Sequence, residues 1–524
     1  MQHHDTEFGR VEVTTLPLPE NLGEDVNGTY TYSGRVLVSV REPEKDKDWY
    51  RVFTIEDNGD GLCEVFAGII PQKKGANGIR WMCFSDNRRI LLGDYVIECE
   101  PDLDHCEHSR LLEVVFPEEI TQIPGIFMRW SEPIIAPDGE HVCFSSLTMG
   151  SAFNFLGRLV CREDDYVIED ARVISTVSGY EPDPAHPGCF RQTVQRGGEV
   201  KQFVRGGLGI TLAGGGRSLS ESCLQMLDSD EVFAITDTLG YEETAILSPN
   251  ERYAVCMSPR FSPRTDAGLL GVVPLSGDLP TRGRYLNVLY QYAIAGVRSH
   301  RPGNIGPALI NVKRSLKEGR SYKGVDLSDP EGKWVYYSPM SWHPDSTKAL
   351  WNEKTRLNDA PVRCRLRICH LLDKEPSEPV TAVRTPDPEA IPYSEPISAA
   401  LTLVSLPMPL VVCGISGTVT NCQTEDGFFE TRYENYSEDG KSFYDGFVRV
   451  KSPSNMFMPG AIAIQSRITV SGEHHGQTDF SLVWNADSRF QVFPDFTLDE
   501  NGLPKCRGFA EYDGTFRDVA DLEP

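Results

Sequence analysis

The clearest β-hairpin pattern in the sequence is Trp130-Ser-Glu-Pro-Ile-Ile-Ala-Pro-Asp-Gly-Glu-His-Val-Cys-Phe-Ser-Ser146. An apolar run leads into Pro137, Asp138 and Gly139, and a second apolar run follows them. Proline presets the backbone φ angle, and aspartate and glycine tolerate a tight reversal of the chain. Short apolar runs on either side of such residues are typical of two paired strands. The sequence therefore predicts antiparallel strands joined at Asp138.

The same strand–turn–strand pattern recurs along the chain. Clear copies are Glu243-Thr-Ala-Ile-Leu-Ser-Pro-Asn-Glu-Arg-Tyr-Ala-Val-Cys-Met-Ser258 and Ser338-Pro-Met-Ser-Trp-His-Pro-Asp-Ser-Thr-Lys-Ala-Leu-Trp351, and weaker copies are residues 80–92 and 433–443. The turns are centred on Asp86, Asp138, Asn250, Asp345 and Asp439, which are separated by 52, 112, 95 and 94 residues. These separations fit a period of about 50 residues. We therefore expect degraded copies near residues 195, 297 and 392.

This repeat resembles that of the TolB-like β-propellers. Another stretch, Tyr50-Arg-Val-Phe-Thr-Ile-Glu-Asp-Asn-Gly-Asp-Gly-Leu-Cys-Glu-Val-Phe66, resembles the two outer strands of a blade in that family. The resemblance extends in patches over residues 30–445. It implies an all-β fold, a β-propeller of six to eight four-stranded blades. It says little about activity, because this architecture serves binding proteins, peptidase-associated domains and lyases alike.

Three segments are expected along the chain. Residues 1–29 are expected to be an N-terminal extension, residues 30–404 the propeller blades and residues 405–524 a β-rich C-terminal segment. Residues 462–471 and 480–484 are rich in β-branched and aromatic residues and predict long strands in the last segment. The pattern leaves open whether that segment supplies the final blades or an appended β-domain.

The net charge and the placement of the cysteines indicate the cellular compartment and exclude some classes of binding partner. The 524 residues carry a formal net charge of −25, which repels nucleic-acid backbones and anionic lipid. The first residues lack the basic and apolar stretches of a secretory signal, and no apolar run is long enough to span a membrane. Cys143, Cys256 and Cys413 lie in apolar runs, as buried thiols do. We expect a soluble cytoplasmic protein with reduced cysteines that binds neither nucleic acid nor membranes.

Candidate site residues follow from the repeat. In a propeller, the residues that precede the innermost turn by six or seven positions lie near one mouth of the central channel. We expect substrate binding by residues whose charges would line that mouth, namely Arg80, Arg129, Glu395 and Arg432. Catalysis is expected from carboxylates at the mouth and from histidines, which are bases near neutral pH, namely Glu132, Glu243, His186 and His343. The alternative is that these charges pair with one another and hold neighbouring blades together.

A metal cofactor stays an open expectation. The TolB-like propellers include oligogalacturonate lyases, whose channel histidines bind a divalent metal, so the resemblance makes a divalent metal conceivable. The metal-binding motif of those lyases is not matched residue by residue, and none of its ligands is carried over. Residues 99–108 contain two cysteines and two histidines, but their spacing is unlike that of common zinc sites and predicts an acidic loop.

Two classes of function remain. The first is an enzyme of lyase, isomerase or hydrolase type that acts on a small oxygenated organic substrate by histidine and carboxylate acid–base chemistry at the channel mouth. The alternative is a non-catalytic propeller scaffold that binds a partner protein. The Gly-x-Ser-x-Gly and His-Glu-x-x-His motifs are both absent from the sequence, which removes the commonest hydrolase and metalloprotease signatures. We expect a small-molecule substrate rather than a protein partner.

Overall fold

The computed structural model describes most of the chain. It describes residues 2–19, 25–71, 80–148, 152–213, 221–237, 242, 244–261, 305–355, 363–402, 406–451, 460–486 and 492–522. These residues are mostly β-strand, with two short α-helices, α3 (Val312–Glu318) and α4 (Ile397–Leu401). No helix in these ranges is both long and apolar enough to cross a membrane.

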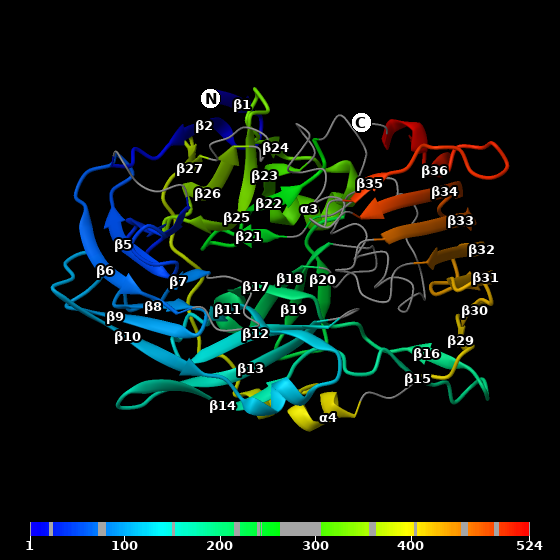
Figure 1. The fold of residues 1–524 in the computed structure, drawn as a ribbon, viewed down its shortest axis with the longest axis horizontal. Coiled ribbons are helices and arrows are strands. Elements are labelled where there is room, and N and C mark those ends of the chain that lie inside the picture. The colour runs from blue at the N-terminus through cyan, green and yellow to red at the C-terminus, as the bar shows by residue number, and fades with distance from the viewer. Residues whose placement is uncertain are drawn as a thin grey trace.

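Six groups of four antiparallel strands, which we call meanders, make up the larger part of the described fold (Figure 1). The first meander contains β3 (Val26–Tyr30), β4 (Val36–Arg41), β5 (Trp49–Ile55) and β6 (Cys63–Ile69). The second contains β7 (Trp81–Cys83), β8 (Arg89–Leu92), β9 (Tyr95–Glu100) and β10 (His108–Val115). The third contains β11 (Ile126–Ile135), β12 (His141–Thr148), β13 (Ala152–Cys161) and β14 (Asp165–Val173). A parallel pairing of β10 with β14 joins the second and third meanders into one sheet.

Of the remaining three meanders, the sixth combines strands β25–β27 with β2 from the beginning of the chain. The fourth contains β17 (Glu199–Val204), β18 (Gly209–Ala213), β19 (Ser222–Met226) and β20 (Val232–Ala234). The fifth contains β21 (Ala245–Leu247), β22 (Tyr253–Ser258), β23 (Gly306–Asn311) and β24 (Val325–Asp326). The sixth contains β25 (Trp334–Trp342), β26 (Lys348–Thr355), β27 (Cys364–Leu371) and β2 (Gly9–Thr15), with β1 (Gln2–Asp5) on its edge. Part of the expected N-terminal extension is therefore hydrogen-bonded to β27.

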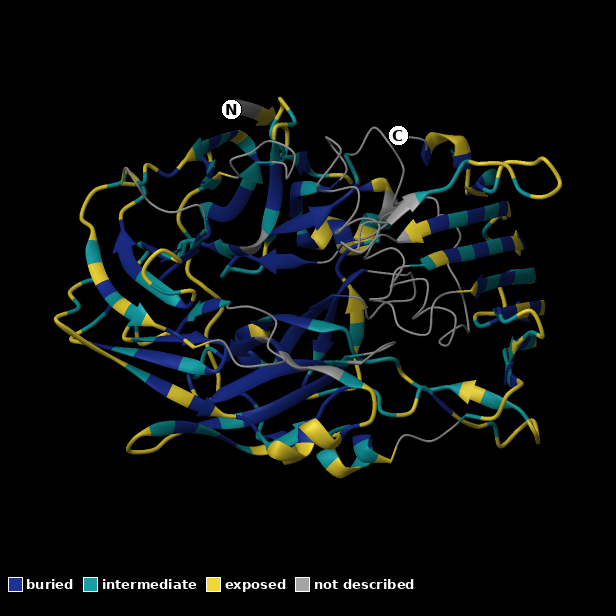
Figure 2. Cartoon of the chain, in the orientation of Figure 1, coloured by how far each residue is buried: buried dark blue, intermediate teal, exposed yellow. Residues whose placement is uncertain are grey.

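Hydrophobic clusters fill the spaces between successive meanders in cyclic order. Each cluster includes side chains from two neighbouring meanders, and the cluster of the fifth and sixth also includes residues after Leu410. The sixth meander packs back on the first. Representative pairs, from the first–second to the sixth–first interface, are Val52 with Ile90, Leu91 with Phe144, Ile134 with Ile210, Leu224 with Ile310, Val255 with Trp351, and Leu350 with Val38. The first strands also contact the neighbouring meanders in this order, and β25 contacts β3. Figure 2 shows the buried residues concentrated on these strands.

The repeated turns lie where the sequence predicts hairpins. Asp86, Asp138, Asn250 and Asp345 each lie in the turn between the first and second strands of a meander. The first and fourth meanders have the same hairpin, at residues 31–35 and 205–208, without the sequence pattern. The expected copy near residue 297 lies outside the described residues, and β22 and β23 on either side of it belong to one meander. No strand lies between β27 and β28 (Glu395–Pro396) where a copy was expected near residue 392.

An extended segment, residues 372–396, crosses these turns; we call it the strap. Its backbone nitrogens donate to Asp345 O at 3.0 Å, to Pro249 O at 2.8 Å and to Gly206 O at 2.9 Å. Thr385 N then donates to Asp138 Oδ2 at 2.9 Å. The strap ends at β28, which pairs with β14. It therefore joins the turns of the sixth, fifth, fourth and third meanders in that order.

A second large sheet stands to one side of the six meanders (Figure 1). It contains the hairpin β15 (Tyr180–Pro182) and β16 (Phe190–Gln192), followed by strands from the end of the chain: β29 (Leu410–Cys413), β30 (Ser416–Gln423), β31 (Phe429–Ser437), β32 (Ser442–Lys451), β33 (Gly460–Gly472), β34 (Gly476–Ala486), β35 (Val492–Pro494), β36 (Arg507–Tyr512) and β37 (Thr515–Asp518). We call it the C-terminal sheet. Along β33 buried and partly exposed residues alternate, as expected of strands with one face packed on a core. Asp439 lies in its β31–β32 turn rather than in a meander.

We expect Asp138→Ala to lower the free energy of unfolding by about 3 kcal/mol, because four hydrogen bonds lose their acceptor. Asp138 accepts from the backbone of Glu140, His141 and Thr385 and contacts His141 Nδ1 at 2.8 Å. Urea denaturation measures the change. Asp86→Ala is the matched control, since Asp86 caps only its own turn, through Arg88 and Arg89. Equal losses in the two variants would contradict a role of Asp138 in holding the strap.

The same carboxylate predicts a pH dependence. Burial raises the pKa of Asp138, but hydrogen bonds from His141, Glu140 and Thr385 outweigh it and hold the pKa well below the usual carboxyl range. A depressed native pKa stabilises the folded protein above the unfolded pKa of about 4, and the contribution is lost as the pH falls below it. The stability gap between wild type and Asp138→Asn should therefore be largest near neutral pH and shrink in acid. A variant of the exposed Asp164 should show no such trend.

Candidate functional site

A pocket of about 380 Å³ opens at the turn end of the first and sixth meanders, beside the second. Its walls come from hairpin turns of all three meanders, and nearly all of its lining side chains are polar or charged. The lining residues are Ser33, Gly34, Arg35, Glu56, Asp57, Asp104, His105, His343 and Lys348. This is the end of the strands where the repeated turns lie, whereas the sequence analysis placed ligand binding at the opposite end, before the innermost strands.

His343 is held in the pocket wall by its neighbour in the turn. Its Nδ1 atom lies 2.7 Å from Asp345 Oδ1 and 3.3 Å from the Asp345 backbone nitrogen. The Asp345 backbone N–H donates a hydrogen bond to Nδ1, and the carboxylate contact is an ion pair when the imidazole is protonated. In the neutral ring either nitrogen can carry the proton, and Nε2 is the basic nitrogen in the tautomer that has its proton on Nδ1.

Asp345 is suited to hold the ring because it stays ionised. Burial raises the pKa of Asp345, but hydrogen bonds from the backbone and hydroxyl of Thr347, together with His343, outweigh burial and lower it. The Thr347 bonds measure 2.9 Å and 2.7 Å. The Tyr30 ring packs edge-on against the imidazole, with centroids 5.3 Å apart. The orientation of His343 is therefore fixed by both charge and packing.

Gly34 packs against the Nε2 edge of the His343 ring. Its φ angle is +92°, a conformation that side chains rarely adopt, and a Cβ atom there would lie 2.4 Å from His343 Nε2. Because Gly34 also lines the pocket, Nε2 points toward the cavity wall that lacks a side chain.

Cations and carboxylates share the rest of the lining. Lys348 Nζ lies 2.5 Å from Asp57 Oδ2, and Tyr30 donates to Asp57 Oδ1 at 3.0 Å. Arg35 bridges Glu56 and Asp104, with 3.6 Å to the latter. Such a wall offers ammonium and guanidinium groups to a substrate carboxylate, and carboxylates to substrate hydroxyls. Together with Nε2 it contains the groups that proton transfer on a small polar molecule needs.

Among the sequence-predicted residues whose side chains the structure describes, His343 is the one that lines this pocket. His186 lies on the β15–β16 hairpin of the C-terminal sheet, and Arg432 lies on β31 of the same sheet, paired with Glu430 at 2.5 Å. Glu395 is exposed on β28. Arg129 and Glu132 are on β11, where the structure describes their backbone, and Glu243 lies outside the described residues.

Arg80 belongs to a second group of charges, on or beside the first strands of the meanders. Lys201 Nζ lies 2.8 Å from Glu199 Oε2, and the Lys201 side chain is 2% exposed. Ser131 of β11 donates to the same carboxylate. Burial raises the pKa of Glu199, but the charges of Lys201 and Arg80 and the hydrogen bonds from Lys201 and Ser131 outweigh it and lower the pKa. This group matches the alternative in which charges hold neighbouring meanders together.

Several residues of both groups were missed by sequence reasoning. Lys201 lies between apolar residues in Val200-Lys201-Gln202-Phe203-Val204, and a charged residue inside a buried strand is a signal that could have found it. Asp57 belongs to an Asp-Asn-Gly turn that was interpreted only as a strand connection. Lys348 carries no local signal, because its partner lies in a different meander.

Comparisons with known proteins agree with a β fold and add no function. No family model matches the chain, and no curated protein matches it. Among solved structures, TolB from Acinetobacter baumannii is similar at 14% identity over 66% of this chain and 65% of that chain, with a TM-score of 0.31. Prolyl oligopeptidase B from Galerina marginata is similar at 11% identity over 80% of this chain and 46% of that chain, with a TM-score of 0.28. The tricorn protease is similar at 9% identity over 100% of this chain and 45% of that chain, with a TM-score of 0.24. The chain thus spans under two thirds of each of these proteins, and the structural similarity is distant.

We expect Lys201→Met to lower the free energy of unfolding by about 3–5 kcal/mol, because it leaves the Glu199 carboxylate buried without its cation. Adding Glu199→Gln to the same chain should restore most of the loss. Urea denaturation of the single and double variants measures both effects. The control is Lys441→Met, which breaks an exposed pair with Glu473 and should cost less than about 1 kcal/mol. A Lys201→Met effect as small as the control would show that the buried pair does not support the fold.

Proposed function

We propose that this protein is an enzyme that removes a proton from a small, hydroxyl-rich organic acid, with His343 as the general base. The observation that carries this proposal is the contact of 2.7 Å between His343 Nδ1 and Asp345 in the pocket wall. In the proposed reactive tautomer Nδ1 donates to Asp345, and Nε2, which lies against Gly34, is the base. A carboxylate that fixes one imidazole nitrogen orients the ring and stabilises the imidazolium formed when the other nitrogen takes a proton. Lyase and isomerase reactions both begin with such a step.

The substrate class follows from the charges of the wall. Lys348 and Arg35 can each turn from their present partners to neutralise a substrate carboxylate and the enolate charge that develops beside it. Glu56, Asp57 and Asp104 would accept hydrogen bonds from substrate hydroxyls. A pocket of about 380 Å³ suits a molecule the size of a sugar acid.

The proposed architecture is a six-bladed β-propeller of the TolB-like kind, with each meander as one blade. Support comes from the cyclic order of the hydrophobic clusters and from β25 contacting β3. In such a ring β2 would complete the last blade and close it with a strand from the other end of the repeat region. The proposed pocket would then lie on the face formed by the innermost turns.

A cytoplasmic location and a small-molecule partner remain part of the proposal. Burial raises the pKa of the Cys83, Cys256 and Cys369 thiols to about 12, which keeps them protonated and unreactive at neutral pH. Such cysteines suit a reducing compartment.

The test is solvent exchange at the carbon next to the carboxylate. Malate, tartrate, gluconate and galacturonate are incubated with the protein in deuterated water and followed by proton NMR. We expect at least one acid to exchange its α-proton, and His343→Gln to lower that rate by about 10²-fold or more. Asp345→Asn should lower it less, because the base remains but its orientation is lost.

The matched control is His108→Gln, an exposed histidine at the start of β10 outside the pocket lining, which should exchange like wild type. Exchange that persists in His343→Gln would refute the assigned base. No exchange of any of the four acids above the protein-free rate would refute the proposed function.

A further inference from the structure

The hairpin of β15 and β16 links the two parts of the fold. It lies in the chain between β14 of the third meander and β17 of the fourth, yet it belongs to the C-terminal sheet. Its pairing with that sheet is one parallel bridge, Phe190 with Val412 of β29. So short a ladder contributes little by itself, because most sheet stability comes from longer pairings and packed faces.

Metal-binding side chains gather at the tip of this hairpin. Asp183, His186 and Cys189 are spaced three residues apart in Asp183-Pro-Ala-His186-Pro-Gly-Cys189. Successive tight turns bring them together, since His186 N donates to Asp183 O at 3.3 Å and Cys189 N donates to His186 O at 3.0 Å. The hairpin closes with a bond of 2.9 Å from Asp183 N to Cys189 O. The loop therefore presents carboxylate, imidazole and thiol from one short segment.

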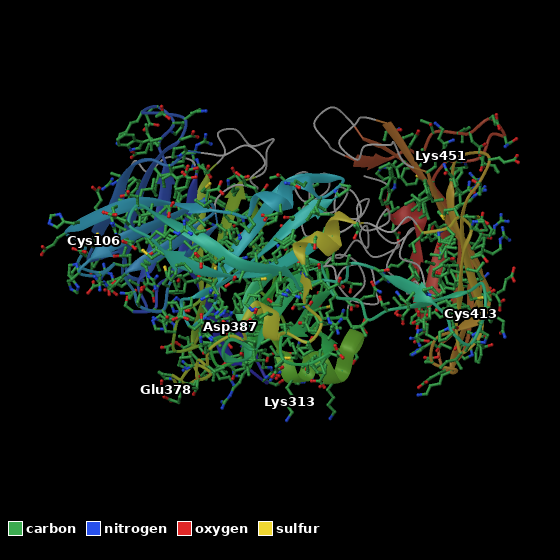
Figure 3. The ribbon with its side chains drawn as sticks, turned by 90° about the horizontal axis from the view of Figure 1, so that it is seen from below. Cys106, Lys313, Glu378, Asp387, Cys413 and Lys451 are labelled. Carbon is green, nitrogen blue, oxygen red and sulfur yellow. The ribbon has the colours of Figure 1, made fainter. Side chains whose placement is uncertain are left out.

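Cys413 completes the group from the other side of the bridge. It ends β29, next to Val412, and Figure 3 shows it at the edge where the hairpin meets the C-terminal sheet. One ligand atom each of Asp183, His186 and Cys413 lie within 4.8 Å of one another. Burial and a hydrogen bond with Cys189 raise the pKa of the Cys413 thiol to about 12. Three donor atoms from two distant segments thus lie together, and the Cys189 thiol contacts Cys413 beside them.

We propose that Asp183, His186, Cys189 and Cys413 bind one zinc ion that fastens the β15–β16 hairpin to the C-terminal sheet. Thiolate ligands select zinc over magnesium or calcium, and two sulfurs with one nitrogen and one oxygen suit its tetrahedral geometry. Four protein ligands leave no open position, so the site is structural rather than catalytic. His186 then has a binding role in the fold and is not the catalytic base that the sequence suggested.

To take the ion, the Cys189 thiol would have to move closer to Asp183 and His186, because the compact group holds only these two and Cys413. His186 Nδ1 and Asp183 Oδ2 lie 2.7 Å apart and share a proton. Zinc–nitrogen and zinc–oxygen distances of about 2.0–2.2 Å in a tetrahedron separate two ligands by about 3.3–3.5 Å. The ion would replace the shared protons of the imidazole–carboxylate and thiol–thiol contacts, and binding would release protons.

Among the residues that the structure describes, no second group of three such donors is this compact. Cys99 and Cys106 also hydrogen-bond, but they lie in the loop that was expected to be acidic rather than metal-binding. His105 in that loop contacts Asp102 at 3.1 Å instead.

The test uses the full chain purified without a histidine tag and loaded with zinc, then with cobalt(II). We expect one zinc per chain by plasma mass spectrometry after dialysis, and X-ray absorption with two sulfurs at about 2.3 Å and two lighter ligands at about 2.0–2.2 Å. The cobalt form should show thiolate-to-metal charge transfer and the visible bands of tetrahedral cobalt. Cys189→Ser and Cys413→Ser should each lose the metal, and Asp183→Asn should weaken zinc affinity at least tenfold.

Cys422→Ser, on the adjacent strand β30, is the matched control and should retain one zinc with unchanged spectra. Zinc-free protein after loading, a cobalt spectrum without thiolate bands, or a disulfide between Cys189 and Cys413 in peptide maps of the isolated protein would each overturn the proposal. The cobalt and absorption spectra of the wild-type chain decide the ligand set even if a cysteine variant fails to fold.

Discussion

The hairpin turn between the first and second strands of each meander is the constraint on which the rest of the structure depends. In the third meander Asp138 accepts bonds from the two residues that follow Gly139, and so fixes the angle between β11 and β12. The turns also bond to one another. Ser85 Oγ donates to Pro137 O at 3.0 Å, and Asn250 N donates to Ser346 Oγ at 3.1 Å. A polar turn that binds both its own strands and the next turn sets the spacing at which the apolar faces between meanders can pack.

Packing between meanders explains why apolar strands recur along the chain and why β2, from the beginning of the chain, pairs with β27 in the sixth meander. Each meander buries one face against each neighbour, and a unit with one face unpaired would expose a hydrophobic surface. The sixth meander avoids this by taking β2 from the beginning of the chain, which costs loop-closure entropy that grows only slowly with length. Ion pairing supports the junction, because Arg10 contacts Asp373 at 2.7 Å as the chain leaves β27 for the strap.

Local chemistry explains which parts of this fold the sequence could predict. Asp138 and Asp345 mark turns because proline, aspartate and small residues have a direct backbone role there. The turn at residues 205–208 was not predicted, because Gly206 at φ +68° and Gly207 at φ +113° reverse the chain without a capping aspartate. The 95 residues between Asn250 and Asp345 separate the turns of two successive meanders, because β22 and β23 pair within one meander. The candidate pocket could not be predicted at all from spacing, because Lys348 and Asp57 meet only when the sixth meander packs on the first.

The strap explains why a pocket opens where it does. Its bonds run over the turns of the sixth, fifth, fourth and third meanders, where Thr385 also donates to Gly207 O at 3.0 Å. Those turns therefore have their polar groups satisfied by the chain itself. The turns of the first and second meanders are joined instead by side chains, such as Ser33 donating to Asp104 at 3.0 Å. A charged side chain can leave its protein partner for a charged group of a ligand and stay paired with an opposite charge. Breaking backbone hydrogen bonds to admit a ligand would cost more free energy. The sector that the strap leaves to side chains thus borders the sixth-meander turn, and the candidate pocket opens between them.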